Sequence, residues 1–348
     1  MDWMIYGASG YTGRLAAEEA ARRGLAPILA GRREEGVRPL AESLGLSWRV
    51  FGLDEPDRLR RGLEGVTTVL HCAGPFSATC APMLEACLDG RVNYLDITGE
   101  ITVFAHCHAR HARAVKRGIV VLPGAGFDVV PTDCLAAMLK REMPDARELV
   151  LAFESGGGFS PGTARTSVEG LGSGGRVRKD GELKKVPLAW KWRYFTRDGE
   201  QRSAMTIPWG DVYTAHVSTG IPDIEVYMAA PPATIKRLRR LRLLGPLLGT
   251  GPVQRFLKGQ VEKKVRGPSQ ALREQTESFI WGEVRNPAGR LLARQLRTPN
   301  GYALTVDASL GIVTRLIERD PPAPGYYTPS MLMGPEYVLG LDGVELFT

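Results

Sequence analysis

Apolar and polar positions in the first third of the chain alternate between short strands and amphipathic helices. The stretch "DWMIY" predicts a buried strand, and "RLAAEEAARRG" after it has a helical composition that ends at Gly24. The predicted strands continue with "APILAG", "SWRVFGLD", "VTTVLHCAG", "VNYLDITGE" and "IVVLPGAG". Helices are predicted between them, the last being one helix over "ITVFAHCHARHARAVKRG". This alternation predicts an α/β fold with a Rossmann-like, doubly wound parallel sheet.

The pattern changes between residues 150 and 230, which are rich in glycine and in residues that favour strands. Here "ELVLAFESGGG", "MTIPWGDVYTAHVS" and "IEVYMAAP" predict strands of a second sheet. Between them, "GLGSGGRVRKDGELKKVP" predicts a helix end followed by a loop or a hairpin.

Three glycines follow the first strand at once, in "GASGYTG". Their spacing is G-x-x-G-x-x-G, one residue longer than the usual dinucleotide fingerprint. Strand, glycine turn and helix in this order favour a phosphate site, because a pyrophosphate approaches backbone without Cβ atoms and meets the N–H groups of a helix N-terminus. The alternative is a structural turn without a ligand. The expected cofactor-binding residues of this turn are Gly7, Ser9, Gly10, Tyr11, Thr12 and Gly13.

The second predicted strand ends at Gly31 and is followed by Arg32 and Arg33. Enzymes that prefer NAD usually carry an acid here, which binds the ribose 2′-hydroxyl, whereas a guanidinium pairs with a 2′-phosphate. We therefore predict NADP(H) as the cofactor, bound by Arg32 and Arg33, with Arg32 as the leading partner of the 2′-phosphate. The alternative is a pair of solvated arginines at a strand end.

Composition fits a globular protein of about two domains, since hydrophobic residues make up 43% and charged residues 24% of the 348 positions. We expect no transmembrane helix, because no apolar run of about 18 residues occurs. The first residues lack the pattern of a secretory leader, so we expect a cytoplasmic protein. An odd number of cysteines without paired spacing indicates reduced thiols: Cys72, Cys80, Cys87, Cys107 and Cys134.

The net charge of +7 is concentrated in one stretch, since residues 236–266 hold ten basic side chains and one acid. We therefore expect a local surface contact and no general nucleic-acid binding. Ile235, Leu238, Leu241 and Leu244 repeat at three-residue spacing among these cations, which predicts a basic amphipathic helix. Residues 235–266 would then make a peripheral membrane contact. Alternatively, the leucines belong to the protein core or to a homodimer contact.

With these motifs in view, the first 135 residues resemble the saccharopine-dehydrogenase-like oxidoreductases, especially the trans-acting enoyl reductase branch. The resemblance depends on "GASGYTG" with "AGRR", on "CAGPF", on "YLDITGE" and on "GAGFDVVPTD". Looser landmarks follow in "SPGTARTS", "GPSQALR", "GYALT" and "YYTPSMLMG". The likeness thus covers most of the chain, densely at first and sparsely in the middle.

The resemblance implies that "CAGPF" passes beneath the cofactor, which adds to the expected cofactor-binding residues Ala73, Gly74, Pro75 and Phe76. It also implies a domain organisation: an NADP-binding domain over 1–130, a second α/β domain with a mixed sheet over 131–320, and a segment over 321–348 that returns to the first domain. The stretch "SMLMGPEYVLGLDG" is the expected returning helix.

A hydride-transfer enzyme must orient the acceptor and supply a proton, and such groups are expected near the strand ends that face the cofactor. The catalytic candidates are Tyr94, Asp96, Asp128 and Tyr213, with Glu100, Asp133, Asp211 and His216 nearby in the sequence. Tyr94 would donate a hydrogen bond to a developing enolate. The alternative for Asp96 and Glu100 is that they cap the next helix, and for Asp128 that it fixes a turn.

We expect no metal site in "HCHARH". On a single helix, His106 and His108 point about 200° apart, and acidic partners are missing nearby.

The resemblance implies an NADPH-dependent reductase in lipid metabolism that acts on an activated C=C (enoyl) group of a lipid- or polyketide-like substrate. Two alternatives stay open. One is an imine or carbonyl reductase of the saccharopine dehydrogenase type, although no arginine set for two carboxylates is evident. The other is a non-catalytic NADP-binding scaffold at a membrane surface.

Overall fold

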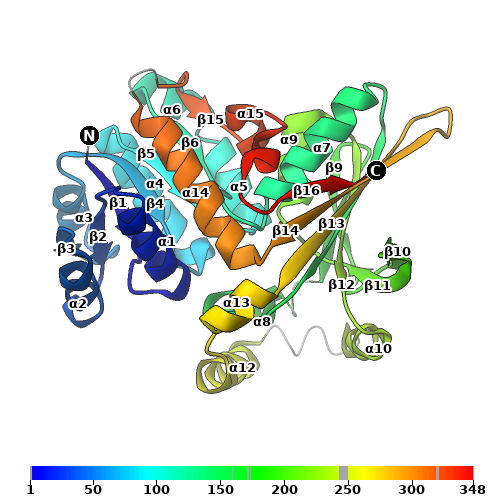
Figure 1. Ribbon diagram of the computed structural model, residues 1–348, viewed down its shortest axis with the longest axis horizontal. Helices are drawn as coiled ribbons and strands as arrows, with labels where there is room; N and C mark the ends of the chain where they lie inside the picture. The colour runs from blue at the N-terminus through cyan, green and yellow to red at the C-terminus, as the bar shows by residue number, and fades with distance from the viewer. Residues whose placement is uncertain are drawn as a thin grey trace. The chain divides into compact units, whose positions relative to one another are not determined.

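The computed structural model describes residues 2–158, 160–170, 172, 174–242, 250–318 and 321–347. It contains two compact units (Figure 1). The first comprises Met1–Val130 and Leu304–Met333, and the second comprises Pro131–Ala303 and Gly334–Thr348. Leu244, which we assigned to the basic amphipathic helix, lies outside the described residues.

The first unit is built on a parallel sheet of seven strands in the order β15-β6-β5-β4-β1-β2-β3. The strands are β1 (Asp2–Tyr6), β2 (Ile28–Gly31), β3 (Trp48–Val50), β4 (Val66–His71), β5 (Asn93–Asp96), β6 (Val120–Leu122) and β15 (Gly325–Tyr326). The order reverses at β1, which lies between β2 and β4, so the predicted doubly wound sheet is confirmed. Ligands of such sheets bind outside the carboxyl ends of the strands next to this reversal.

Helices follow the strands of this sheet. They are α1 (Tyr11–Arg22), α2 (Glu34–Leu44), α3 (Pro56–Gly62), α4 (Phe76–Gly90), α5 (Ile101–His108), α6 (His111–Arg117) and most of α14 (Gly301–Ile317). The single helix predicted over "ITVFAHCHARHARAVKRG" is wrong, because the chain leaves helical geometry at Arg110 before α6 begins. The Arg110 guanidinium donates to the His106 carbonyl oxygen at 3.0 Å and to Glu85 at 2.7 Å. These hydrogen bonds stabilise the non-helical conformation between α5 and α6.

The second unit contains a mixed sheet whose main path is β10-β11-β12-β7-β13-β14-β16, with β8 and β9 beside it. Its strands are β7 (Glu148–Ser155), β8 (Gly175–Lys179), β9 (Glu182–Val186), β10 (Trp192–Arg197), β11 (Glu200–Thr206), β12 (Asp223–Ala229), β13 (Glu277–Arg285), β14 (Leu291–Pro299) and β16 (Glu345–Phe347). Its helices include α7 (Val130–Glu142), α8 (Pro161–Gly170), α9 (Asp211–Thr219), α10 (Pro232–Leu241), α12 (Gly251–Lys264) and α13 (Gln270–Gln275). None of the helices described is long and apolar enough to cross a bilayer.

The hairpin reading of "RVRKDGELKKVP" is confirmed by the pairing of β8 with β9. Asp180 and Gly181 at its tip have φ values of 53° and 79°, as a tight hairpin turn requires. In contrast, "DVYTAHVST" is the helix α9 and not a strand. Val212, Ala215 and Thr219 are buried at three- and four-residue spacing, so its β-forming residues cover one helix face.

The C-terminal segment differs from the expected returning helix. Residues Pro329–Met333 form the short helix α15, and Gly334 and Pro335 end it, since proline cannot continue a helix. A 3₁₀ turn over Tyr337–Gly340 follows, and β16 then pairs with β14 in the second unit. The first unit instead receives β15, which pairs with β6, and most of α14.

Candidate functional site

The glycine turn after β1 is packed so closely that two of its glycines have no room for a side chain. Gly7, with φ +85°, donates its N–H to the Ala30 carbonyl oxygen at 2.8 Å, which ties the turn to β2. A Cβ on Gly7 would lie 2.9 Å from the Cβ of Ala73. A Cβ on Gly13 would lie 2.3 Å from the Gly7 oxygen. These glycines therefore let α1 start against the end of β1.

The N-terminus of α1 is open to an anion. Ser9 and Gly10 are exposed, and Tyr11 and Thr12 are half-buried. Within the described chain, no side chain caps this helix, and its first turn holds no acidic residue. The first-turn N–H groups and the positive end of the helix dipole thus face the carboxyl edge of the sheet, as a phosphate requires.

Helix α4 starts at the same edge but its N-terminus is already occupied. The Glu100 carboxylate accepts hydrogen bonds from the backbone N–H of Phe76 at 3.0 Å and of Ser77 at 2.9 Å. Glu100 does stand at the N-cap position of the next helix, α5, but its side chain makes no capping hydrogen bond there and instead binds the N-terminus of the preceding helix. Because the Glu100 carboxylate already occupies the N-terminus of α4, α1 is the helix of this pair whose N-terminus can receive a phosphate.

Arg32 follows β2 beside this turn and is exposed. In the part of the chain that the structure describes, its side chain makes no hydrogen bond and no ion pair. Burial raises the pKa of Tyr6, at the end of β1, to about 12, and the positive charge of Arg32 opposes that rise. Arg33 is also exposed and precedes α2. By comparison, Arg38 on α2 is paired with Glu34 and Glu42.

The "CAGPF" loop leaves β4 next to the glycine turn. The Cys72 N–H donates to the Tyr6 carbonyl oxygen at 2.8 Å, and the Thr79 hydroxyl donates to the Ala73 oxygen at 2.6 Å. Gly74 is exposed, whereas Ala73, Pro75 and Phe76 are half-buried. The four predicted cofactor-binding residues thus form a fixed loop at the same sheet edge as Gly7 and Arg32.

His71, which sequence reasoning missed, is linked to this loop through the Thr79 hydroxyl. It is the last residue of β4 and is fully buried. Its Nε2 lies 3.1 Å from the Thr79 hydroxyl, which itself donates to Ala73, so Nε2 is the donor of this pair. Burial lowers the pKa of His71 to about 3, and the ring is therefore neutral at physiological pH. Its position directly before "CAGPF" was the available sequence clue.

Tyr94 and Asp96 are brought together, but inside the protein. Both are fully buried on β5, and the Tyr94 hydroxyl donates to Asp96 at 2.7 Å. Asp96 also accepts from the N–H groups of Thr98 and Gly124, each at 3.0 Å. Burial raises the pKa of Asp96 to about 6 and that of Tyr94 well above 10. This burial favours a structural role for both, and Asp96 fixes a turn and does not cap a helix.

Asp128 is the candidate carboxyl group that lies at the site edge. It is half-buried, and a Cβ on Gly99 would lie 2.7 Å from its Oδ2. Its turn is held by the Phe127 N–H, which donates to the Thr305 hydroxyl at 2.9 Å. Burial, together with the negative charge of Glu100, raises the pKa of Asp128 to about 7. A carboxyl group that keeps its proton near neutral pH can act as an acid.

The remaining candidates lie in the second unit. Asp133 accepts from Ser218 at 2.6 Å, Asp211 accepts from Thr132 at 2.7 Å, and His216 Nδ1 lies 2.9 Å from the Ile221 oxygen. The Arg178 guanidinium lies over the Tyr213 ring at 5.8 Å. These contacts stabilise α9 and its neighbours, and the catalytic role of Tyr213 stays a prediction.

Two of the three "HCHARH" histidines, His108 and His111, contact β15 of the first sheet. The His108 ring stacks on Tyr326, with centroids 4.6 Å apart, and His111 Nδ1 accepts from the Tyr326 N–H at 3.1 Å. Cys107 lies elsewhere, in contact with Cys80.

Comparison with known proteins agrees with this geometry. Residues 3–122 match the family model described as the saccharopine dehydrogenase NADP binding domain. A saccharopine dehydrogenase-like oxidoreductase of Rattus norvegicus is 29% identical over 53% of this chain and 50% of its own length. A protein of Mycobacterium tuberculosis named as a trans-acting enoyl reductase is 31% identical over 49% of this chain and 44% of its own length. The chain spans about half the length of these curated relatives.

Two solved structures share the whole architecture. The saccharopine dehydrogenase (L-Glu forming) of Saccharomyces cerevisiae has a TM-score of 0.65, at 10% identity, over 100% of both chains. The homospermidine synthase of Legionella pneumophila, solved with NAD, has a TM-score of 0.64, at 11% identity, over 99% of this chain and 91% of its own. At these identities the likeness shows the fold alone. The predicted family resemblance and NADP-binding domain are confirmed.

Proposed function

We propose that this chain, whose residues 3–122 are a saccharopine dehydrogenase NADP-binding domain, is an NADPH-dependent oxidoreductase that reduces an activated C=C group of a lipid- or polyketide-like substrate. The observation that carries the proposal is the combination, at one sheet edge, of an open helix N-terminus, an unpaired arginine and a carboxyl group protonated near neutral pH. The name of the mycobacterial relative supports the enoyl substrate class.

Different residues of the site would bind different parts of the nucleotide. The first turn of α1 and Gly10 would hold the pyrophosphate, and Arg32 would pair with the 2′-phosphate. The loop over Ala73–Phe76 would lie beneath the ribose and the nicotinamide ring, because it follows the strand next to the reversal point of the sheet. When bound, the reduced nucleotide supplies a hydride.

Asp128 is the proposed proton donor. Reduction of an activated double bond adds a hydride to one atom, and the negative charge that develops on the acceptor needs one proton. Asp128 holds that proton near neutral pH, because burial and the Glu100 carboxylate disfavour its ionised form. Being half-buried, it can take a replacement proton from solvent after each turnover.

A membrane contact is our second proposal, and the observation that favours it is a set of uncompensated cations on α10. Lys236, Arg237 and Arg240 are exposed, and none makes an ion pair with another described residue. Together with Ala233 and Leu241, they line a depression of about 430 Å³. On α12, Phe256 is 65% exposed. Ile235, the first of the apolar residues that repeat at three-residue spacing, is fully buried and is therefore part of the protein core. We therefore propose that the cations, with Phe256, meet anionic lipid headgroups.

The oxidation of NADPH by the purified chain tests the proposed reaction. Matched panels of enoyl thioesters, cyclic imines and ketones would be offered, with NADPH absorbance as the readout. Turnover of the enoyl panel alone supports the proposal. Turnover of imines or ketones alone would instead assign the reductase of the saccharopine dehydrogenase type. Binding of NADPH without turnover of any panel would leave a nucleotide-binding scaffold.

A further inference from the structure

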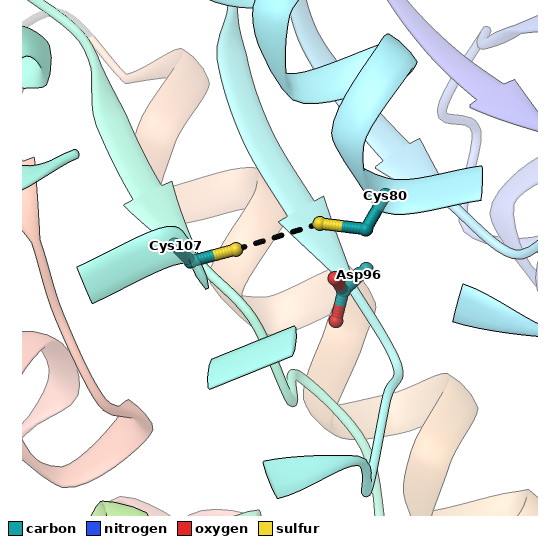
Figure 2. Close-up of side chains that lie close together, drawn as sticks. All are labelled: Cys80, Asp96 and Cys107. Atoms are coloured by element: carbon teal, nitrogen blue, oxygen red, sulfur yellow. Dashed lines mark hydrogen bonds between the residues drawn. The ribbon is translucent and has the colours of Figure 1, made fainter. Parts of the chain in front are cut away.

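Two buried cysteines and an aspartate lie close together in the first unit (Figure 2). Cys80 comes from α4, Cys107 from α5 and Asp96 from the end of β5. The two sulfur atoms point toward one another and lie 3.6 Å apart. One donor atom from each of the three residues lies within 4.8 Å of the other two, and all three side chains are fully buried or nearly so.

The spacing of these atoms is that of a coordination site. Zinc–sulfur bonds of about 2.3 Å at the tetrahedral angle place two sulfur ligands about 3.8 Å apart, close to the observed 3.6 Å. Two thiolates with one carboxylate suit a divalent ion of intermediate softness, whereas a hard ion such as magnesium prefers oxygen ligands alone. Burial raises the pKa of the Cys107 thiol, and an ion that binds would displace its proton.

The surroundings of Asp96 fix its carboxylate in place. Oδ1 accepts the N–H groups of Thr98 and Gly124, and Oδ2 accepts the Tyr94 hydroxyl. A carboxylate has about four acceptor positions, so Oδ2 keeps one lone pair for a further contact. Hydrogen bonds of this kind orient the ligands of metal sites and tune their affinity. The hydrogen bond from the buried Tyr94 hydroxyl to Asp96 would have this orienting role.

We propose that Cys80, Cys107 and Asp96 bind a single divalent cation of the zinc class. The ion would hold α4 and α5 against the end of β5 and so fix the elements from which the Ala73–Phe76 loop and Glu100 extend. Its role is structural, because the donors face the protein interior. The proposal does not depend on the proposed reaction. It also differs from the metal site rejected in "HCHARH", since Cys107 is the one residue of that stretch involved.

Titration of the purified, reduced and metal-free chain with Co²⁺ tests this site, because thiolate ligands give cobalt a charge-transfer absorption band in the near ultraviolet. We expect one equivalent of Co²⁺ to bind with this band, and one equivalent of Zn²⁺ to displace it. Cys80→Ser and Cys107→Ser are each expected to lose at least half of the band's intensity, because each removes one of the two thiolates. Tyr94→Phe, which keeps the ligands but removes one hydrogen bond to Asp96, should weaken binding by about 10–100-fold.

Cys134→Ser is the matched control, since Cys134 is an equally buried cysteine in the second unit. It should retain one equivalent and the full band. The proposal is overturned if the wild-type chain gives no thiolate band, or if the band keeps its full intensity in Cys80→Ser or Cys107→Ser. A disulfide between Cys80 and Cys107 with no metal binding after reduction would also overturn it. Since the wild-type titration decides the first outcome, a variant that fails to fold does not rescue the proposal.

Discussion

Gly13 packs against Gly7 so closely that a Cβ on Gly13 would lie 2.3 Å from the Gly7 carbonyl oxygen. Gly10 stands between them in the sequence but in a different environment. It is exposed, its φ is −74°, and a Cβ there would lie 3.2 Å from the same oxygen. The glycines of one motif therefore have separate physical roles, one in packing and one in leaving the backbone accessible.

This difference predicts opposite results for two alanine substitutions. Gly13→Ala should lower the free energy of unfolding by about 1–3 kcal/mol, because the new methyl group overpacks the turn. Gly10→Ala should change stability by less than about 0.5 kcal/mol but weaken NADPH binding about tenfold, a loss of about 1.4 kcal/mol. Denaturant unfolding and isothermal calorimetry measure the two effects. Equal stability losses in both variants would contradict the separation.

Arg32 should decide the choice between the two nicotinamide nucleotides. Arg32→Ala is expected to weaken NADPH binding by about 1.5–3 kcal/mol, the contribution of a charged hydrogen bond, and to leave NADH binding unchanged. Calorimetry with each nucleotide measures this. Arg38→Ala is the control, since Arg38 is already paired with Glu34 and Glu42 and should affect neither nucleotide. If Arg32→Ala weakened both equally, Arg32 would not be the 2′-phosphate partner.

The pKa of Asp128, raised to about 7 by burial and by Glu100, predicts the pH dependence of turnover. An acid acts only while protonated, so kcat should fall about tenfold per pH unit above pH 7. Asp128→Asn should lower kcat by about 10²–10⁴-fold and remove this limb of the profile. The affinity for NADPH, measured by fluorescence titration, should be unchanged. An unaltered pH profile in Asp128→Asn would assign the proton to another group.

His71 predicts a loss of stability in acid. Burial lowers its pKa to about 3 in the folded chain, from about 6.5 when unfolded, so the unfolded state binds one more proton between these values. The free energy of unfolding should therefore decrease as the pH falls below about 6.5, by about 1.4 kcal/mol per pH unit from this group. His71→Gln, which keeps a donor for Thr79, should flatten that slope in denaturant unfolding. Identical slopes would show that His71 does not control it.

The cations of α10 should be needed for membrane binding. The charge-reversal triple variant of Lys236, Arg237 and Arg240 to glutamate is expected to abolish flotation with vesicles that contain phosphatidylserine, because each cation contributes about 1 kcal/mol near an anionic surface. Arg14, Arg58 and Arg60 are exposed arginines in the first unit, and their triple reversal serves as the control. Retained flotation of the α10 variant would exclude this surface.

The first sheet could be predicted from the sequence because its information is local. Each strand is a short apolar run followed by a turn or helix signal, and Gly7, Gly13 and Arg32 have meaning from their position after a strand. Glu100 could not be assigned this way, since its partners, Phe76 and Ser77, lie more than twenty residues earlier. The contact between Cys80 and Cys107 could not be predicted for the same reason, because it requires two helices to pack side by side.

The second unit was harder to predict, because strand-forming residues do not by themselves specify a strand. Val212 and Thr219 favour strands, yet they form one buried face of α9, a spacing that only the packed structure makes visible. For the C-terminal segment the prediction failed in the opposite direction, because a helix was expected where most of the segment is not helical. Its apolar residues suggested a helix, but Gly334 and Pro335 divide it between two sheets.

The first unit takes β15 and most of α14 from a part of the sequence far beyond residue 130, which matters for any attempt to produce this unit alone. A fragment truncated after residue 130 would end before the outermost partner of β6 is synthesised, and Val120 and Val121 would lose their neighbours in the ladder. Such a truncation would bare an unpaired strand edge that invites aggregation. A folded minimal version would instead need Leu304–Met333 joined to it, by an artificial linker or by circular permutation.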